Sequence, residues 1–210
     1  MKFEIKCATF LRLAKICEFF EPECPLNERA SLTTVRLENY NGKSFAIVTN
    51  KRIAAIEYLG FAPLGDGVAH VILDPQVLTQ CRAETFLDGT LIINTIPEIA
   101  TAMASTSSGW NHSGNACYWW DETPLDKWRL WCPDEPIKKH EGIMFWGLFA
   151  VQSLLESSPS GEVYFPKYIN CSKPVVLRDK HNDNWVGLFI PEPFESTQRE
   201  SAELPEWWNI

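Results

Sequence analysis

The thiols and imidazoles of the chain are the first candidates for chemistry. Seven cysteines and four histidines occur among the 210 residues, but no two cysteines have the C-x-x-C spacing that structural zinc sites favour. The phosphate-binding G-x-x-x-x-G-K-[ST], the nucleophile elbow G-x-S-x-G and the zinc-binding H-E-x-x-H are absent from the sequence. The acidic doublets Asp121-Glu122 and Asp134-Glu135 have no evident catalytic partner. We therefore expect no enzyme, no catalytic residue, no metal and no cofactor.

Basic side chains that could bind a phosphate backbone are the second candidates. Arg12 and Lys15 lie three residues apart in a stretch with helical spacing, and Arg82 follows a second predicted helix. A solvated helix surface is the commoner role for such residues, and an anion-binding ridge is the more specific one. The net charge of −8 argues against a protein coated in basic charge but leaves room for a locally basic face.

The overall composition is that of a globular protein. Hydrophobic residues make up 45% and charged residues 22% of the chain, which is long enough for one large domain or two small ones. The start MKFEIK does not resemble a signal peptide, and no run of about 18 apolar residues could cross a membrane. The unpaired spacing of the cysteines favours reduced thiols. We therefore expect a cytoplasmic protein.

The elements that would position these residues follow a repeated order. The first 60 residues predict strand, helix, strand, strand and strand, at residues 1–6, 8–20, 32–38, 44–49 and 52–59. Period-two alternation marks the first strand, apolar residues three and four apart mark the helix, and Asn41-Gly42 is a strong hairpin signal.

The same order then recurs. Residues 68–73 read as a strand, and residues 74–81 as a helix with Asp74 as N-cap and Pro75 in the first turn. Phe86, the Asp88-Gly89 turn and residues 91–95 predict a hairpin, and residues 99–104 another strand. Residues 105–118 read as a loop, and no helix is evident in residues 105–142.

A third unit is predicted near the C-terminal end. A helix within residues 143–159, the stretch after Gly161 and a closing hairpin in residues 174–191 would form it, and this helix has no lysine or arginine. We expect one domain of two units at 1–105, an irregular linker at 106–142, a partial domain of one unit at 143–193 and a flexible tail at 194–210. The fold class is α+β: repeated βαβββ units with antiparallel sheets and two or three helices on one face.

The tail ends in the apolar residues Leu204, Trp207, Trp208 and Ile210 after a polar, charged stretch. Two roles are open for it: docking back on the body of the protein, or a short motif for another protein.

Four segments, in this order, resemble the bacterial-type sliding clamp, the beta subunit of DNA polymerase III. FAIVTNKRIAAIE is similar to the clamp's strand-turn-strand of the form ATDGHRLA, with one residue fewer at the turn. VAHVILDPQVLTQC is similar to the clamp strand that enters the second helix. TPLDKWRLWCP resembles the inter-domain linker FPDYRRVLP, lengthened by one or two residues, and PVVLRDKHNDNWVGLFIP resembles the last hairpin, which ends in VMPMR.

The resemblance implies a peptide-binding cleft between two adjacent domains. Clamps accept short peptides rich in Leu and Phe there, from polymerases and other replication proteins. The matching positions lie in a strand turn, the linker and the last strand: Thr49, Arg52, Ile53, Pro124, Arg129, Leu130, Leu188 and Ile190. Any one of the apolar residues could instead belong to the core.

The resemblance also implies a ring that holds double-stranded DNA without reading its sequence. Basic residues on inner helices would contact phosphates, which here implies Arg12, Lys15 and Arg82. The first hypothesis is a ring-forming processivity factor, of a compact kind that would suit a phage or prophage. The second is a monomeric, clamp-derived interaction module that does not encircle DNA. The third is a small enzyme or ligand-binding protein whose likeness to clamps is accidental.

Overall fold

The computed structural model describes residues 2–19, 34–50, 53–62, 65–96, 101–112, 117–118, 128–129, 148–165 and 174–189. The first unit has the predicted order. It comprises strand β1 (Lys2–Lys6), helix α1 (Cys7–Ala14) continued by the 3₁₀ helix η1 (Lys15–Phe19), and strands β2 (Thr34–Tyr40), β3 (Lys43–Thr49) and β4 (Ile53–Phe61). Asn41 and Gly42 join β2 to β3 with φ of 49° and 72°, the left-handed conformation that a two-residue hairpin turn requires.

The second unit contains strand β5 (Gly67–Ile72), helix α3 (Pro75–Thr85) and strands β6 (Thr90–Ile96) and β7 (Thr101–Thr106). Asp74 is the N-cap as predicted, because its Oδ1 accepts from the backbone N–H of Gln76 at 2.7 Å. The predicted hairpin at Asp88-Gly89 was wrong. The helix continues to Thr85, and the buried carboxylate of Glu84 in its last turn accepts hydrogen bonds from Gln80 and Thr106. Asp88 and Gly89 therefore join a helix to a strand.

The third unit contains helix α4 (Leu148–Ser157) and strands β10 (Val163–Tyr164), β11 (Val175–Asp179) and β12 (Trp185–Phe189). The closing hairpin is therefore confirmed, with β11 and β12 antiparallel. Two short strands, β8 (Asn111–His112) and β9 (Cys117–Tyr118), occur in the stretch that the sequence predicted as a loop.

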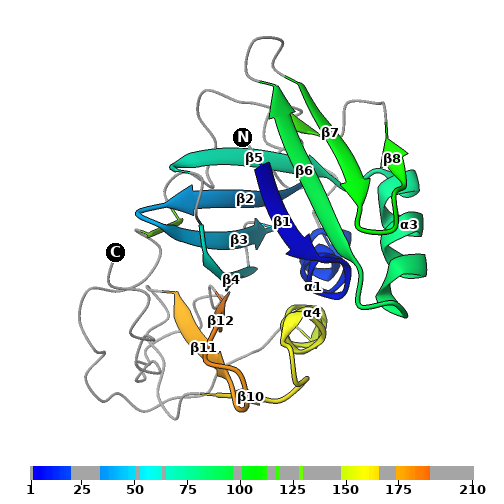
Figure 1. Cartoon of the computed structure of the whole chain (residues 1–210). Coiled ribbons are helices and arrows are strands. Elements are labelled where there is room, and N and C mark those ends of the chain that lie inside the picture. Colours follow the sequence, from blue (N-terminus) through cyan, green and yellow to red (C-terminus); the bar gives the residue numbers. More distant parts are fainter. Residues whose placement is uncertain are drawn as a thin grey trace, which may run out of the picture.

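The strands form two antiparallel sheets whose orders show an exchange between the first two units (Figure 1). The four-stranded sheet has the order β1-β6-β7-β8, so β1 of the first unit joins the strands of the second. The eight-stranded sheet has the order β10-β11-β12-β4-β3-β2-β5-β9, so β5 joins the first unit in return. The closing hairpin extends this sheet because β12 pairs with β4.

The larger sheet has an inner face toward the helices and an outer face away from them. The inner face carries Leu37, Ala46 and Trp185, which pack in one buried cluster with Phe10 of α1 and Leu154 of α4. A side chain could not replace the hydrogen of Gly187, since its Cβ would lie 2.5 Å from the Trp185 ring. The outer face carries a second buried cluster: Phe45, Ile47, Ala54, Ile56, Trp128, Val176, Val186 and Leu188.

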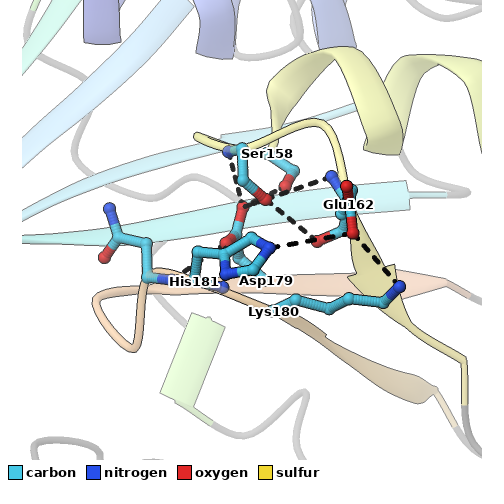
Figure 2. A network of polar contacts seen from close by, with 7 residues as sticks. Ser158, Glu162, Asp179, Lys180 and His181 are labelled. Carbon is cyan, nitrogen blue, oxygen red and sulfur yellow. Dashed lines mark hydrogen bonds and ion pairs between the residues drawn. The ribbon is translucent and has the colours of Figure 1, made fainter.

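A buried carboxylate connects α4 to the closing hairpin (Figure 2). Asp179 is 2% exposed and accepts five hydrogen bonds. Ser158 Oγ, Ser160 Oγ and the Ser160 N–H donate to one oxygen, and the N–H groups of His181 and Asn182 donate to the other. Asp179 thus fixes both the exit from α4 and the turn between β11 and β12.

Among the cysteines that the structure describes with their side chains, Cys7, Cys17 and Cys81 are buried and form no disulfide bond. No helix within the described ranges has the length and apolarity to span a bilayer.

Candidate functional site

A row of residues across three strands of the outer face brings distant segments together. Thr49 of β3 pairs with Ala54 of β4, and Ala54 pairs with Leu188 of β12. Directly opposite residues point to the same face of a sheet, so all three side chains lie on the outer face. The β3–β4 connection therefore lies beside the C-terminal end of β12.

Hydrogen bonds hold the β3–β4 connection in place. Thr49 Oγ1 donates to the carbonyl of Ile53 at 2.8 Å, and Asn50 Oδ1 accepts from the Ile53 N–H at 2.9 Å. Both side chains are at least nine-tenths buried. These bonds connect the end of β3 to the start of β4.

Trp128 and Arg129 lie over the same outer face. The Trp128 ring is fully buried, with its centroid 5.4 Å from that of Phe45, and its Nε1–H donates to Glu38 at 3.1 Å. The Arg129 guanidinium lies 4.3 Å from the ring centroids of both Tyr40 and Trp128, close enough for cation–π attraction.

Glu38 is the centre of a buried charge network beneath these rings. Its carboxylate forms ion pairs with Arg36, at 2.8 Å, and with Arg129. Arg36 Nη1 also lies 3.4 Å from Nε2 of His70 on β5. The side chain of Glu38 is 5% exposed, so one buried carboxylate compensates the charge of two guanidinium groups.

The structure separates the residues predicted for the cleft. Thr49, Arg129 and Leu188 lie on the outer face, whereas Ile53 lies on the inner face and packs in the core with the helices. Arg52, Pro124, Leu130 and Ile190 lie outside the described residues.

Sequence reasoning missed two members of this site, Trp128 and Glu38. A usable signal was present for Glu38: Arg36, Glu38 and Tyr40 alternate with the apolar Val35 and Leu37, which predicts a polar outer face on β2.

The three residues predicted to face DNA differ in their surroundings. Arg12 is half-buried; it donates to Glu57 at 2.6 Å and to the carbonyl of Ser157, and so connects α1 to β4 and α4. Burial raises the pKa of Glu57, although the positive charge of Arg12 acts to lower it. Lys15 is half-buried in η1, and Arg82 is exposed on α3. Of the three, only Arg82 is exposed.

We expect replacement of Arg12 to affect stability. Arg12→Met should lower the free energy of unfolding by about 3 kcal/mol, because it leaves the Glu57 carboxylate buried without its cation. The matched control Arg82→Met should stay within about 0.5 kcal/mol of the wild type, since Arg82 is exposed. Urea unfolding of both variants measures the difference, and equal midpoints would contradict a structural role for Arg12.

In the described part of the chain, no group of three or more His, Cys, Asp or Glu side chains could hold a metal ion.

Comparison with known proteins shows the fold. No protein-family model matches the sequence, and no curated protein matches it. Solved structures do: a DnaN sliding clamp from Pseudomonas aeruginosa bound to griselimycin has a TM-score of 0.58 at 11% identity and covers 92% of this chain. Another Pseudomonas aeruginosa sliding clamp matches with a TM-score of 0.58 at 12% identity and covers 92% of this chain. A putative DNA polymerase III beta subunit from Eubacterium rectale matches with a TM-score of 0.55 at 12% identity and covers 93% of this chain.

The chain therefore has the fold of DNA polymerase III beta sliding clamps, which confirms the predicted fold class. It spans 66% of the length of the griselimycin-bound clamp, 67% of the second and 66% of the Eubacterium rectale protein.

Proposed function

We propose that the chain is a clamp-like adaptor for short Leu- and Phe-rich peptides of a DNA polymerase or another replication protein. The observation that carries the proposal is the row of Thr49, Ala54 and Leu188, which sets the β3–β4 connection beside the end of β12. Trp128 and Arg129 lie on the same face of the sheet. These are the three segments from which the clamp resemblance builds its cleft.

The chemistry of this face suits an extended peptide. Apolar side chains form most of it, with a small number of polar groups to fix a backbone. The Nε–H of Arg129 is buried and has no hydrogen-bond acceptor among the described residues. A peptide carbonyl placed over this face would supply one, and this would also compensate a donor that is costly to leave unpaired.

The test is binding of a fluorescent Leu- and Phe-rich peptide, measured by anisotropy. Arg52→Ala and Ile190→Ala should each weaken binding at least tenfold, because both remove predicted cleft contacts. Arg82→Ala on α3, away from this face, is the control and should bind like the wild type. Absence of saturable binding to the wild type would instead favour an accidental likeness to clamps, with a small enzyme or ligand-binding protein as the remaining class.

In the fuller form of this function, several copies close into a ring around DNA. Arg12, Lys15 and Arg82 would then supply the phosphate contacts, and these would weaken as salt rises. Light scattering across a range of concentrations should give the mass of a stable dimer or trimer. In that case the double variant Lys15→Ala/Arg82→Ala, which leaves the Arg12–Glu57 ion pair intact, should lose DNA retention, and unchanged retention would exclude these two residues as the DNA contacts.

The alternative is a monomeric interaction module that keeps the cleft and does not encircle DNA. Two observations favour it: Arg12 is paired with Glu57, and α4 has no lysine or arginine. A monomer at every concentration, with peptide binding intact, would establish this alternative over the ring.

A further inference from the structure

A second pocket lies at the opposite end of β4 from the cleft. It has a volume of about 330 Å³ and is located where β1 of the smaller sheet meets the ends of β2, β3 and β4. Phe61, on its edge, is eight residues along β4 from Ile53, or about 26 Å at the usual rise of a strand. The pocket is therefore distinct from the peptide-binding face proposed above.

Two buried polar side chains line this pocket. Asn39 of β2 and Ser44 of β3 are direct cross-strand neighbours, and they are 5% and 9% exposed. Neither side chain forms a hydrogen bond with any residue in the described ranges. The polar atoms of this pair are not among the side-chain atoms that are fully buried without a partner, so they border the open pocket and are available to a polar atom of an occupant.

The other walls are apolar and partly aromatic. Phe3 and Leu59 line the pocket, and Phe61 stands at its rim with 85% of its surface exposed. An exposed phenylalanine beside a pocket offers a face on which another ring can stack. At the mouth, Lys2 and Glu4 pair with each other, so this edge carries no net charge that would favour a strongly ionic ligand.

These features together match the indole ring of a tryptophan. Indole is flat and apolar apart from one N–H donor. The amide oxygen of Asn39 or the hydroxyl oxygen of Ser44 could accept a hydrogen bond from it. The pocket volume is within the lower range of small-ligand sites, which suits a single large side chain.

We propose that this pocket binds a tryptophan of the chain's own segment LPEWWNI, at residues 204–210. The segment offers Trp207 and Trp208 side by side, flanked by Leu204 and Ile210. Trp207 lies 18 positions after Phe189, the end of β12, and a stretch of this length can span about 60 Å when extended. The covalent link also gives the segment a high effective concentration at the pocket.

The experiment uses the full-length chain and a fluorescent LPEWWNI peptide, followed by anisotropy. The variant Trp207→Ala/Trp208→Ala vacates the pocket, so it should bind the peptide at least tenfold more tightly than the wild type. Adding Phe61→Ala or Asn39→Leu to this variant should abolish binding. Phe86→Ala, which removes another highly exposed phenylalanine, is the matched control and should leave binding unchanged.

Each other outcome overturns the proposal. Equal binding by the wild type and the Trp207→Ala/Trp208→Ala variant would mean that the tail is not the occupant. No binding by either chain, or binding that survives Phe61→Ala and Asn39→Leu, would mean that the pocket takes no indole. Adding Arg52→Ala to the Trp207→Ala/Trp208→Ala variant distinguishes the two sites. Weaker peptide binding after this addition would place the peptide in the cleft instead of the pocket.

Discussion

Replacement of Glu38 by alanine should lower the free energy of unfolding by about 3–5 kcal/mol, the range for breaking a buried ion pair. Glu38 holds the side chain of Arg36, which is 6% exposed, and accepts from the indole N–H of Trp128. Without the carboxylate, the buried guanidinium of Arg36 would lose its ion pair and the indole N–H of Trp128 would lose this acceptor. Urea unfolding followed by far-UV circular dichroism measures the loss.

Two further variants separate charge from packing. Glu38→Gln keeps the shape and one acceptor oxygen but removes the charge, so it should fall between alanine and the wild type. The double variant Arg36→Met/Glu38→Leu removes the more buried guanidinium together with the carboxylate and should recover part of the lost stability, because apolar residues of similar volume replace such pairs well, although Arg129 still loses its ion pair with Glu38. If the double variant is no more stable than Glu38→Ala, an unpaired charge is not the source of the loss.

Replacement of Asp179 by alanine should cost about 3 kcal/mol, since five hydrogen bonds to one buried carboxylate are lost. Burial acts to raise the pKa of Asp179, but the hydrogen bonds from Ser158, Ser160 and His181 outweigh it and lower the pKa below its usual value. The pKa is thus lower in the folded than in the unfolded chain. The stability that Asp179 contributes is therefore present above about pH 4 and is lost as the pH falls through the folded value.

Asp179→Asn tests this pH dependence directly. Its deficit relative to the wild type should be constant near neutral pH and should shrink below about pH 4, as the wild-type carboxylate takes up its proton. The control is Asp183→Asn, because the side chain of Asp183 is 90% exposed and pairs with Arg178 at the surface. A deficit that stays constant down to pH 2 would contradict the assignment of a lowered pKa.

Local signals predicted local structure well. Asn41-Gly42 predicted its turn, and Asp74 with Pro75 predicted the start of α3, because each depends on the conformation of a few adjacent residues. The Asp88-Gly89 signal failed for the same reason. Its dipeptide suits any tight turn, and the burial of Glu84 against Thr106, 22 residues away, extended the helix toward it.

The candidate site could be predicted only in part. The clamp resemblance supplied Thr49, Arg129 and Leu188, which the structure brings to one face. The alternation of side chains along a strand does not show which face meets the helices, so the inner position of Ile53 could not be foreseen. The bond between Trp128 and Glu38 joins residues 90 positions apart, and no local pattern encodes it.

The pairing of β12 with β4 has a consequence for synthesis of the protein. A ribosome completes β4 long before it adds residues 62–184 and then β12. At about 5–20 residues per second, the nascent chain spends roughly 6–25 s with one edge of β4 unpaired. Ile53, Ala54, Ala55 and Ile56 make that edge apolar on both faces, which is the composition that invites aggregation. The yield of soluble protein should therefore rise at lower expression temperature or with chaperones that cover β4 until the last strand arrives.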